Sequence, residues 1–218
     1  CGASCTWFKR TGSLLLECNV YSGSEIIEND PPAGWVVCEC DLNALAQLLH
    51  ATNEPVIFLN GPAELGPRAL GNRSIICTAT GRENKRLLNN IKYRELYRPV
   101  APVCMEEKAA AIFSPGCPDP YMLFDHIVKE EWRPLVPAIC HIDGTARLQT
   151  VSHDQHPLMY ELLVRYETIS GIPLLCNTSA NLKGSGFFPD IHHACKWNIV
   201  NYVWCNGKLY EKPDKSIP

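Results

Sequence analysis

The chain has 218 residues, a length that favours one large domain, or one domain with an appendage, over two full domains. Hydrophobic residues make up 46% and charged residues 20%, which excludes a disordered or collagen-like chain. No apolar run approaches the roughly 18 residues of a membrane helix, and residues 1–10 lack the features of a secretion signal. We therefore expect a folded cytoplasmic protein with no membrane partner.

The first half of the chain alternates short apolar strands with helices. Residues 13–20 are typical of a strand, and Asp41 can cap a helix that Pro55 closes before a buried strand at 56–59. After a glycine-punctuated loop, the pattern predicts a strand over 74–79, a helix over 81–91, a strand over 100–105 and a helix over 106–113. Helices that feed buried strands indicate an α/β fold.

The second half begins with a surface loop over 114–120, which contains three prolines and one glycine. Further elements are expected as strands over 138–142 and 146–151, a long amphipathic helix over 157–169 and an apolar strand over 173–176. A hairpin over 202–210 should turn at Asn206-Gly207, a dipeptide that favours a type I′ turn. Together these elements predict a mixed α/β (α+β) fold.

The twelve cysteines predict neither a disulfide framework nor a metal site. Disulfide-rich chains are secreted and far shorter than this one, and the sequence has no Cys-x-x-Cys. The apolar strand-like runs hold Cys77, Cys104, Cys140 and Cys176. In such runs a free thiol packs as a small hydrophobe, so we expect a reducing compartment and no bound metal at these cysteines.

Charge is more informative by position than in total. The formal net charge is −3, so no bulk attraction to nucleic acid is indicated and nucleic acid is not an expected partner. Between Gly61 and Arg98, however, eight Lys or Arg residues stand against three Glu, giving +5 and leaving −8 for the rest. This basic island indicates a local anion site, or else a solvated helix face from Arg82 to Arg86.

Two basic segments could bind such an anion. Residues 61–74 contain three glycines, two prolines, Arg68 and Arg73, and could aim two guanidinium groups at one point; the alternative is a rigid turn with surface arginines. Residues 92–99 contain three cations, Lys92, Arg94 and Arg98. If this segment is extended, all three face one side, where a triphosphate would relieve their repulsion. A solvated rim is the other interpretation.

Two further loops are rich in small polar groups. Residues 141–147 join two expected strands through a turn in which Asp143 could meet a ligand, or could simply accept the turn's own amides. Residues 176–184 follow an apolar strand and could hydrogen-bond the phosphate, sugar or base of a nucleotide. An ordinary Asx-turn loop explains the second segment nearly as well.

Taken together, the four segments ELGPRALGNRSI, IKYRELYRPVAPV, HIDGTARLQTVS and CNTSANLKG closely resemble the C-terminal domain of the O-carbamoyltransferase family, which includes nodulation and antibiotic-tailoring enzymes. The resemblance runs from about Asn53 to Cys205. Residues 179–182 also resemble a signature of YrdC-like proteins. The resemblance implies a YrdC-like twisted mixed sheet with helices around a basic cavity, formed by residues 53–218, with 1–52 as an extension or remnant linker.

What this resemblance implies is ATP-dependent activation of carbamoyl phosphate to carbamoyl adenylate, with pyrophosphate leaving and Mg²⁺ expected with the ATP. An N-terminal acceptor domain or separate subunit would then transfer the carbamoyl group to a hydroxyl. The phosphate-holding and catalytic residues would be Lys92, Arg94 and Arg147, joined by Arg98. The implied supporting or nucleotide-binding residues are Arg68, Arg73, Asn177, Ser179 and Asn181.

Two departures keep a second hypothesis open. The family usually has Gly-Glu-Pro where this chain has Gly184-Ser185-Gly186, so an expected carboxylate is missing. The residues before Asn53 are also too few to build the acceptor domain. The chain could therefore be a descendant of that domain retained as a non-catalytic nucleotide-binding, RNA-binding or structural module, for example in a virion or larger assembly. The intact basic residues favour the carbamoyltransferase hypothesis.

Overall fold

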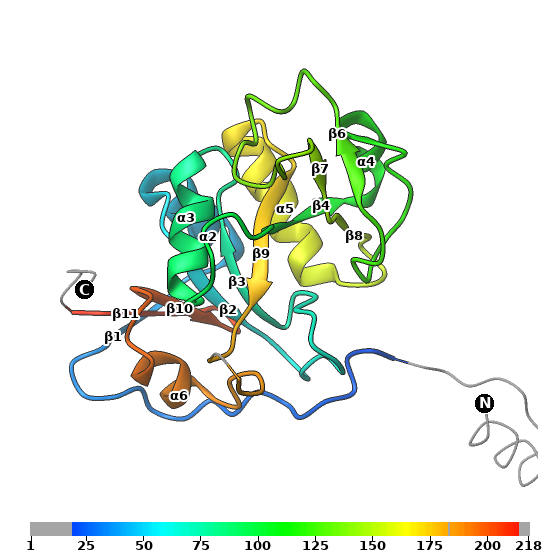
Figure 1. Ribbon diagram of the computed structural model, residues 1–218. Helices are drawn as coiled ribbons and strands as arrows, with labels where there is room; N and C mark the ends of the chain where they lie inside the picture. The colour runs from blue at the N-terminus through cyan, green and yellow to red at the C-terminus, as the bar shows by residue number, and fades with distance from the viewer. Residues whose placement is uncertain (1–18, 183, 214–218) are drawn as a thin grey trace, which may run out of the picture.

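The computed structural model describes residues 19–182 and 184–213 and has an eight-stranded mixed sheet at its centre (Figure 1). The strand order is β1-β11-β10-β2-β3-β9-β4-β8. These strands are β1 (Val36–Glu39), β2 (Val56–Leu59), β3 (Arg73–Cys77), β4 (Ala101–Met105), β8 (Gln149–Val151), β9 (Leu174–Ser179), β10 (Tyr202–Cys205) and β11 (Lys208–Glu211). Only the pairs β10·β2 and β4·β8 are parallel within this sheet of the described chain. The predicted mixed α/β fold is confirmed.

The described helices form where the spacing of apolar residues predicts them, with the exception of the last one, which was not predicted. They are α2 (Leu42–Thr52), α3 (Arg82–Ile91), α4 (Glu106–Ile112), α5 (Pro157–Ser170) and a short α6 (Ile191–Lys196). Asp41 caps α2 by accepting a 2.8 Å hydrogen bond from the Ala44 amide, and left-handed Asn53 ends it. Because α2 packs against α5 and β1 pairs with β11, residues 36–52 belong to the same folded unit as the chain that follows.

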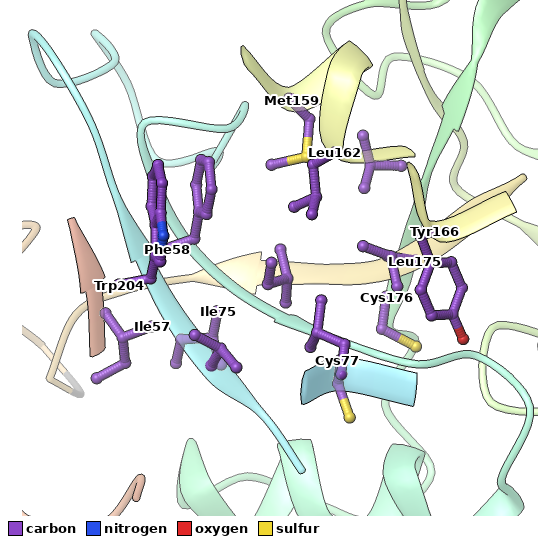
Figure 2. Packing of buried hydrophobic residues seen from close by; sticks show 14 of the residues in the cluster. Ile57, Phe58, Ile75, Cys77, Met159, Leu162, Tyr166, Leu175, Cys176 and Trp204 are labelled. Atoms are coloured by element: carbon purple, nitrogen blue, oxygen red, sulfur yellow. The ribbon is translucent and has the colours of Figure 1, made fainter. Parts of the chain in front are cut away.

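The core is built on both faces of the sheet. Figure 2 shows Phe58 and Trp204, partners in the parallel β2·β10 register, on the side where Met159 of α5 lies. Their rings stack with centroids 4.7 Å apart. The predicted core thiols of Cys77, Cys104 and Cys176 are buried and unpaired, whereas Cys140 is only half-buried. Burial raises the pKa of Cys77 to about 12, so this thiol packs as an uncharged hydrophobe.

Several sequence predictions need correction. The strand expected over 138–142 is wrong: Ala138 and Ile139 are fully buried, but they lie in turns, since burial by itself does not distinguish a strand from a buried turn. The strand expected over 146–151 is divided between β7 and β8. A small sheet of β5 (Phe113–Ser114), β6 (His126–Val128) and β7 (Thr145–Ala146) was not predicted. Strands of two or three residues carry no measurable period.

Other expectations fall at the ends of the described chain. The strand predicted over 13–20 lies, as far as residue 18, outside the described residues, and residues 19 and 20 are not in a strand. The C-terminal hairpin is confirmed, with Asn206 and Gly207 both at positive φ. Within residues 19–182 and 184–213, no helix combines the length and apolarity that crossing a bilayer requires. Over the same ranges, no three His, Cys, Asp or Glu side chains gather to hold a metal ion.

Candidate functional site

The four polar segments meet at one pocket, beside the C-terminal end of β9 and the start of β4. The pocket has a volume of about 190 Å³. Its lining includes Arg68, Arg94, Met122, Arg147, Asn177 and Ser179. Three arginines thus face one hollow, and among the described residues that line it there is no Asp or Glu. Such a site attracts anions because guanidinium groups match phosphate and carboxylate oxygens.

Among the residues of the pocket lining, Arg94 gives the clearest indication of a ligand-binding role. Its Nε donates a 2.6 Å hydrogen bond to the Oδ1 of buried Asn89, which in turn donates to the carbonyls of Leu96 and Arg98. Its Nη2 is buried and has no hydrogen-bond partner in the structure. Burial lowers the pKa of Arg94, and the nearby charge of Arg98 adds to this effect. An arginine held in place with a free, desolvated donor is suited to an anionic ligand.

Asn177, which lines the same pocket, also has an unpartnered polar atom. Its Nδ2 donates to the Ala69 carbonyl at 3.0 Å and to the Gln149 Oε1 at 2.7 Å, which fixes the amide across β8 and β9. Its Oδ1 is buried without a hydrogen-bond partner. Gln149 also donates to the carbonyl of Leu70 at 2.9 Å, so it ties the loop of Arg68 to the sheet. The pocket therefore offers a fixed acceptor as well as cationic donors.

The buried carboxylate of Glu64 holds the loop that carries Arg68 by accepting hydrogen bonds from backbone amides. Glu64, 4% exposed, accepts at Oε1 from the backbone amides of Leu70 and Asn72, each at 2.7 Å, and of Arg73 at 3.2 Å. Three amides on one oxygen fix the curve of the loop. Arg68 is exposed at its tip and lines the pocket.

Arg73 lies outside the pocket lining and is 1% exposed. Its guanidinium donates to the carbonyls of Phe188, Asn60, Gly61, Asn72 and Ser24, at 2.7 to 3.2 Å. Burial lowers its pKa, while the charge of Glu64 opposes this shift. The structure thus gives Arg73 a bracing position between three distant segments rather than a place on the pocket surface.

Lys92 braces the far wall of the pocket. Its Nζ donates to the carbonyls of Ser179, at 2.7 Å, and Asn181, at 2.6 Å, and also to the Asn181 Oδ1, at 2.6 Å. Ser179 donates its hydroxyl to the same Oδ1 at 2.7 Å, and Asn181 donates to the Ser185 carbonyl. Burial, with a smaller contribution from Arg94, lowers the pKa of Lys92 to about 8. Of these three residues, only Ser179 is part of the pocket lining.

The segment 92–99 is not extended, so its three cations do not share one face. Tyr93 has a left-handed φ of 49°, and turns follow it. As a result Lys92 points to the loop of Ser179, Arg94 lines the pocket, and Arg98 makes a 2.7 Å ion pair with Glu95 in which both side chains are more than half exposed. The turn separates charges that would repel one another on a strand.

The segment 141–147 divides in a similar way. Asp143 accepts from the Thr145 amide at 3.0 Å and from its hydroxyl at 2.7 Å, which confirms that it serves its own turn. Arg147, four residues on, lines the pocket, and its Nε lies 3.9 Å from the Oδ1 of Asp125. A pairing at this distance leaves Arg147 available to a more closely placed anion.

Several residues that shape the pocket were not singled out from the sequence. They are Glu64, Asn89, Met122 and Gln149. Gln149 offered one signal, since it is a polar residue inside a predicted strand and follows the apolar Leu148. The other three have hydrogen bonds or positions that arise only when loops distant in sequence come together.

Comparisons with known proteins show the family to which the chain is related. A family model described as Carbamoyltransferase C-terminus matches residues 46–206. The chain is 53% identical to nodulation protein U of Rhizobium tropici over 212 residues, which are 97% of this chain and 37% of that protein. It is 40% identical to 3'-hydroxymethylcephem-O-carbamoyltransferase of Streptomyces clavuligerus over 207 residues, 93% of this chain and 39% of that protein. The chain thus spans less than two fifths of these relatives. The resemblance drawn from the four segments is confirmed.

Proposed function

Since the chain belongs to the carbamoyltransferase C-terminal family, we propose that its pocket activates carbamoyl phosphate with ATP to form carbamoyl adenylate. For the atoms to balance, water first cleaves carbamoyl phosphate to carbamate and inorganic phosphate. A carbamate oxygen then bonds to the α-phosphorus of ATP as the bond from that phosphorus to pyrophosphate breaks. A further domain or subunit would then pass the carbamoyl group to a hydroxyl acceptor. The length of the relatives, of which this chain spans 37% to 39%, supports such a partner.

The observation that carries this proposal is that two residues of the pocket lining each hold a buried polar atom without a hydrogen-bond partner: Arg94 at Nη2 and Asn177 at Oδ1. Buried polar groups without partners are uncommon in folded proteins and call for a ligand or water. The donors present fit phosphate oxygens. A volume of about 190 Å³ is below the roughly 300–1,000 Å³ of drug-sized sites, so the pocket would take the phosphate and carbamoyl groups while the nucleoside extends beyond it.

In this proposal the residues act by neutralising charge and by aligning the reactants. Arg68, Arg94 and Arg147 bind phosphate oxygens, and Asn177 and Ser179 hydrogen-bond the nucleotide. Arg73, Lys92 and Asn181 do not bind the ligand directly but brace the loops around the pocket. Arg98 lies at the exposed rim. ATP supplies the activated phosphorus, with Mg²⁺ accompanying it. No side-chain nucleophile is required, as in other phosphoryl-group reactions.

Calorimetry with ATP tests the assignment. Arg147→Ala should weaken binding tenfold or more, because a hydrogen bond to a charged group contributes about 1.5–3 kcal/mol. Arg165→Ala is the matched control, since Arg165 is exposed and pairs with Glu161 elsewhere on α5. Equal titrations for the parent and Arg147→Ala, or no heat from the parent, would remove the pocket assignment.

A second assay follows pyrophosphate release from ATP. Release should depend on carbamoyl phosphate, and Arg94→Ala should slow it at least tenfold. Release without carbamoyl phosphate would point to a different reaction.

Tight ATP binding with no release would favour the alternative, a non-catalytic nucleotide-binding module. One feature of the chain supports that alternative: Ser185 stands where the family usually has a carboxylate, and its carbonyl only accepts from Asn181 at 2.8 Å. A YrdC-like fold and a cytoplasmic location stay predictions.

A further inference from the structure

We propose that the chain binds a small anion with two or more phosphate groups in a second hollow, lined by Arg82, Lys85, Arg86 and Arg133. This hollow has a volume of about 610 Å³ and lies between α3 and the turns that precede β7. None of its lining residues lines the pocket of Arg94 and Arg147. It is therefore a separate site, and its ligand does not depend on the proposed activation of carbamoyl phosphate.

Two of the four cations are held in place at the hollow. The Nζ of Lys85 donates a 2.9 Å hydrogen bond to the carbonyl of Cys140, and the Nε of Arg133 donates at 2.9 Å to the carbonyl of Val128. The guanidinium of Arg133 also packs on Gly144, where an added Cβ would lie 2.9 Å from Nη2. Both side chains are half-buried. Because each uses only part of its donors in these bonds, the remaining donors stay available to a ligand.

The charge of this hollow is not balanced by the protein. Within the described residues, none of the four cations has a carboxylate within 4.0 Å. The single acidic residue of the lining, Glu83, folds back over Gly81 at the start of its own helix and accepts a 3.4 Å hydrogen bond from Asn53. Burial lowers the pKa of Lys85, which shows that the ammonium is desolvated without compensation from a carboxylate.

The cations also act on a common point. Burial raises the pKa of the Cys140 thiol in the lining, and the charges of Arg133, Lys85 and Arg82 all oppose that rise. Each of these three groups is therefore close enough to influence one location in the hollow. Four cations around one concavity repel each other unless an anion with several charges lies among them.

The shape and the charge distribution favour a small polyphosphate over a nucleic acid. Guanidinium groups bind phosphate oxygens in pairs, and a single phosphate would leave much of the charge unmatched. A concave site of this volume suits a compact ligand. The chain as a whole carries −3, so it has no bulk attraction for a long polyanion.

Calorimetric titration with inorganic tripolyphosphate, near physiological salt, tests the proposal on the full chain. The parent should show two sites per chain. Arg82→Ala with Arg86→Ala should lose one site by tenfold or more in affinity, and both residues are exposed, so the fold is expected to survive. Arg94→Ala should lose the other site only. Lys108→Ala with Lys208→Ala removes the same charge elsewhere and should keep both sites within about threefold.

Each other outcome has a defined meaning. If the Arg82/Arg86 variant keeps both sites, or if the charge-matched control loses as much affinity, the hollow is not a specific site. A single-stranded RNA oligomer that binds the hollow while tripolyphosphate does not would also overturn the proposal. If the proposed function alone fails, the parent shows one site, and only Arg82→Ala with Arg86→Ala removes it. ATP in place of tripolyphosphate shows whether the hollow also admits a nucleoside.

Discussion

The motifs that carry the family resemblance contain two kinds of cation. Arg73 and Lys92 are braced: their side chains donate at short distances to backbone carbonyls from distant segments. Arg68, Arg94 and Arg147 are open: they line the pocket, and Arg94 keeps a buried donor without a partner. Arg68 and Arg73, two arginines only five positions apart, thus have different roles.

The number of donors that remain available separates structural from ligand-binding cations. A guanidinium has five N–H donors. When most of these donors bind backbone carbonyls, the arginine stabilises the loops to which the carbonyls belong. A guanidinium with donors left over in a pocket has capacity for an anion. Replacement of a braced cation should therefore reduce stability, whereas replacement of an open one should reduce affinity.

Removal of the Arg73 side chain, a braced cation, should reduce the stability of the fold more than any of the other substitutions. Arg73→Ala should lower the free energy of unfolding by about 3–5 kcal/mol, because it leaves several backbone carbonyls, those of Asn60, Ser24 and Phe188 among them, without their donor. Urea denaturation measures this change. Arg68→Ala is the control from the same loop and should stay within about 0.5 kcal/mol of the parent. Equal stability of the two variants would contradict the division into braced and open cations.

The second effect concerns the carboxylate beneath the loop. Glu64→Gln should lower the free energy of unfolding by about 1–3 kcal/mol, since the neutral amide accepts the three backbone N–H groups less strongly and buries an NH₂ where Oε2 lies. Hydrogen exchange of the Leu70 and Asn72 amides would report the local loss. Glu161→Gln, on the exposed face of α5, is the matched control. A variant at Glu64 that behaves like this control would show that the loop holds its own shape.

The third effect is a pH dependence from Lys92. Burial and the Arg94 charge lower its pKa to about 8 in the folded state, below its ordinary value of 10.5. Between these values the unfolded chain holds a proton that the folded chain has released, so stability rises with pH, by at most about 1.4 kcal/mol per pH unit. Urea denaturation of the parent and of Lys92→Met at about pH 7.5 and pH 9.5 isolates this contribution, as other groups cancel in the difference. A difference that does not change with pH would place the Lys92 pKa near its ordinary value.

The smallest effect is expected at the rim. Arg98→Ala removes an exposed ion pair with Glu95, worth about 0–1 kcal/mol, and should change ATP affinity by less than about threefold. Arg94→Ala, four residues earlier, should weaken ATP binding tenfold or more. Calorimetry on the two variants side by side makes the test. An equal loss at Arg98 would restore the idea of one continuous cationic face across 92–99.

Part of this molecule could be predicted from local patterns. The helices α2, α3 and α5 and the strands β2, β3 and β4 followed from apolar spacing, caps and proline stops, because those signals depend on near neighbours in the chain. The turn role of Asp143 was one of two interpretations, and its bonds to Thr145 decide between them. The small β5-β6-β7 sheet was missed because its strands are too short for a pattern.

Local patterns of residues account for the fold class, the main helices and the four segments that supply the pocket's polar groups. Which of the cations are braced and which are open depends on tertiary contacts. The Arg73 guanidinium donates to the carbonyls of Ser24 and Phe188, and the Lys92 ammonium donates to those of Ser179 and Asn181. All four carbonyls are far away along the chain. Whether a charged group has a donor to spare depends on such long-range partners, and no local pattern of residues records them.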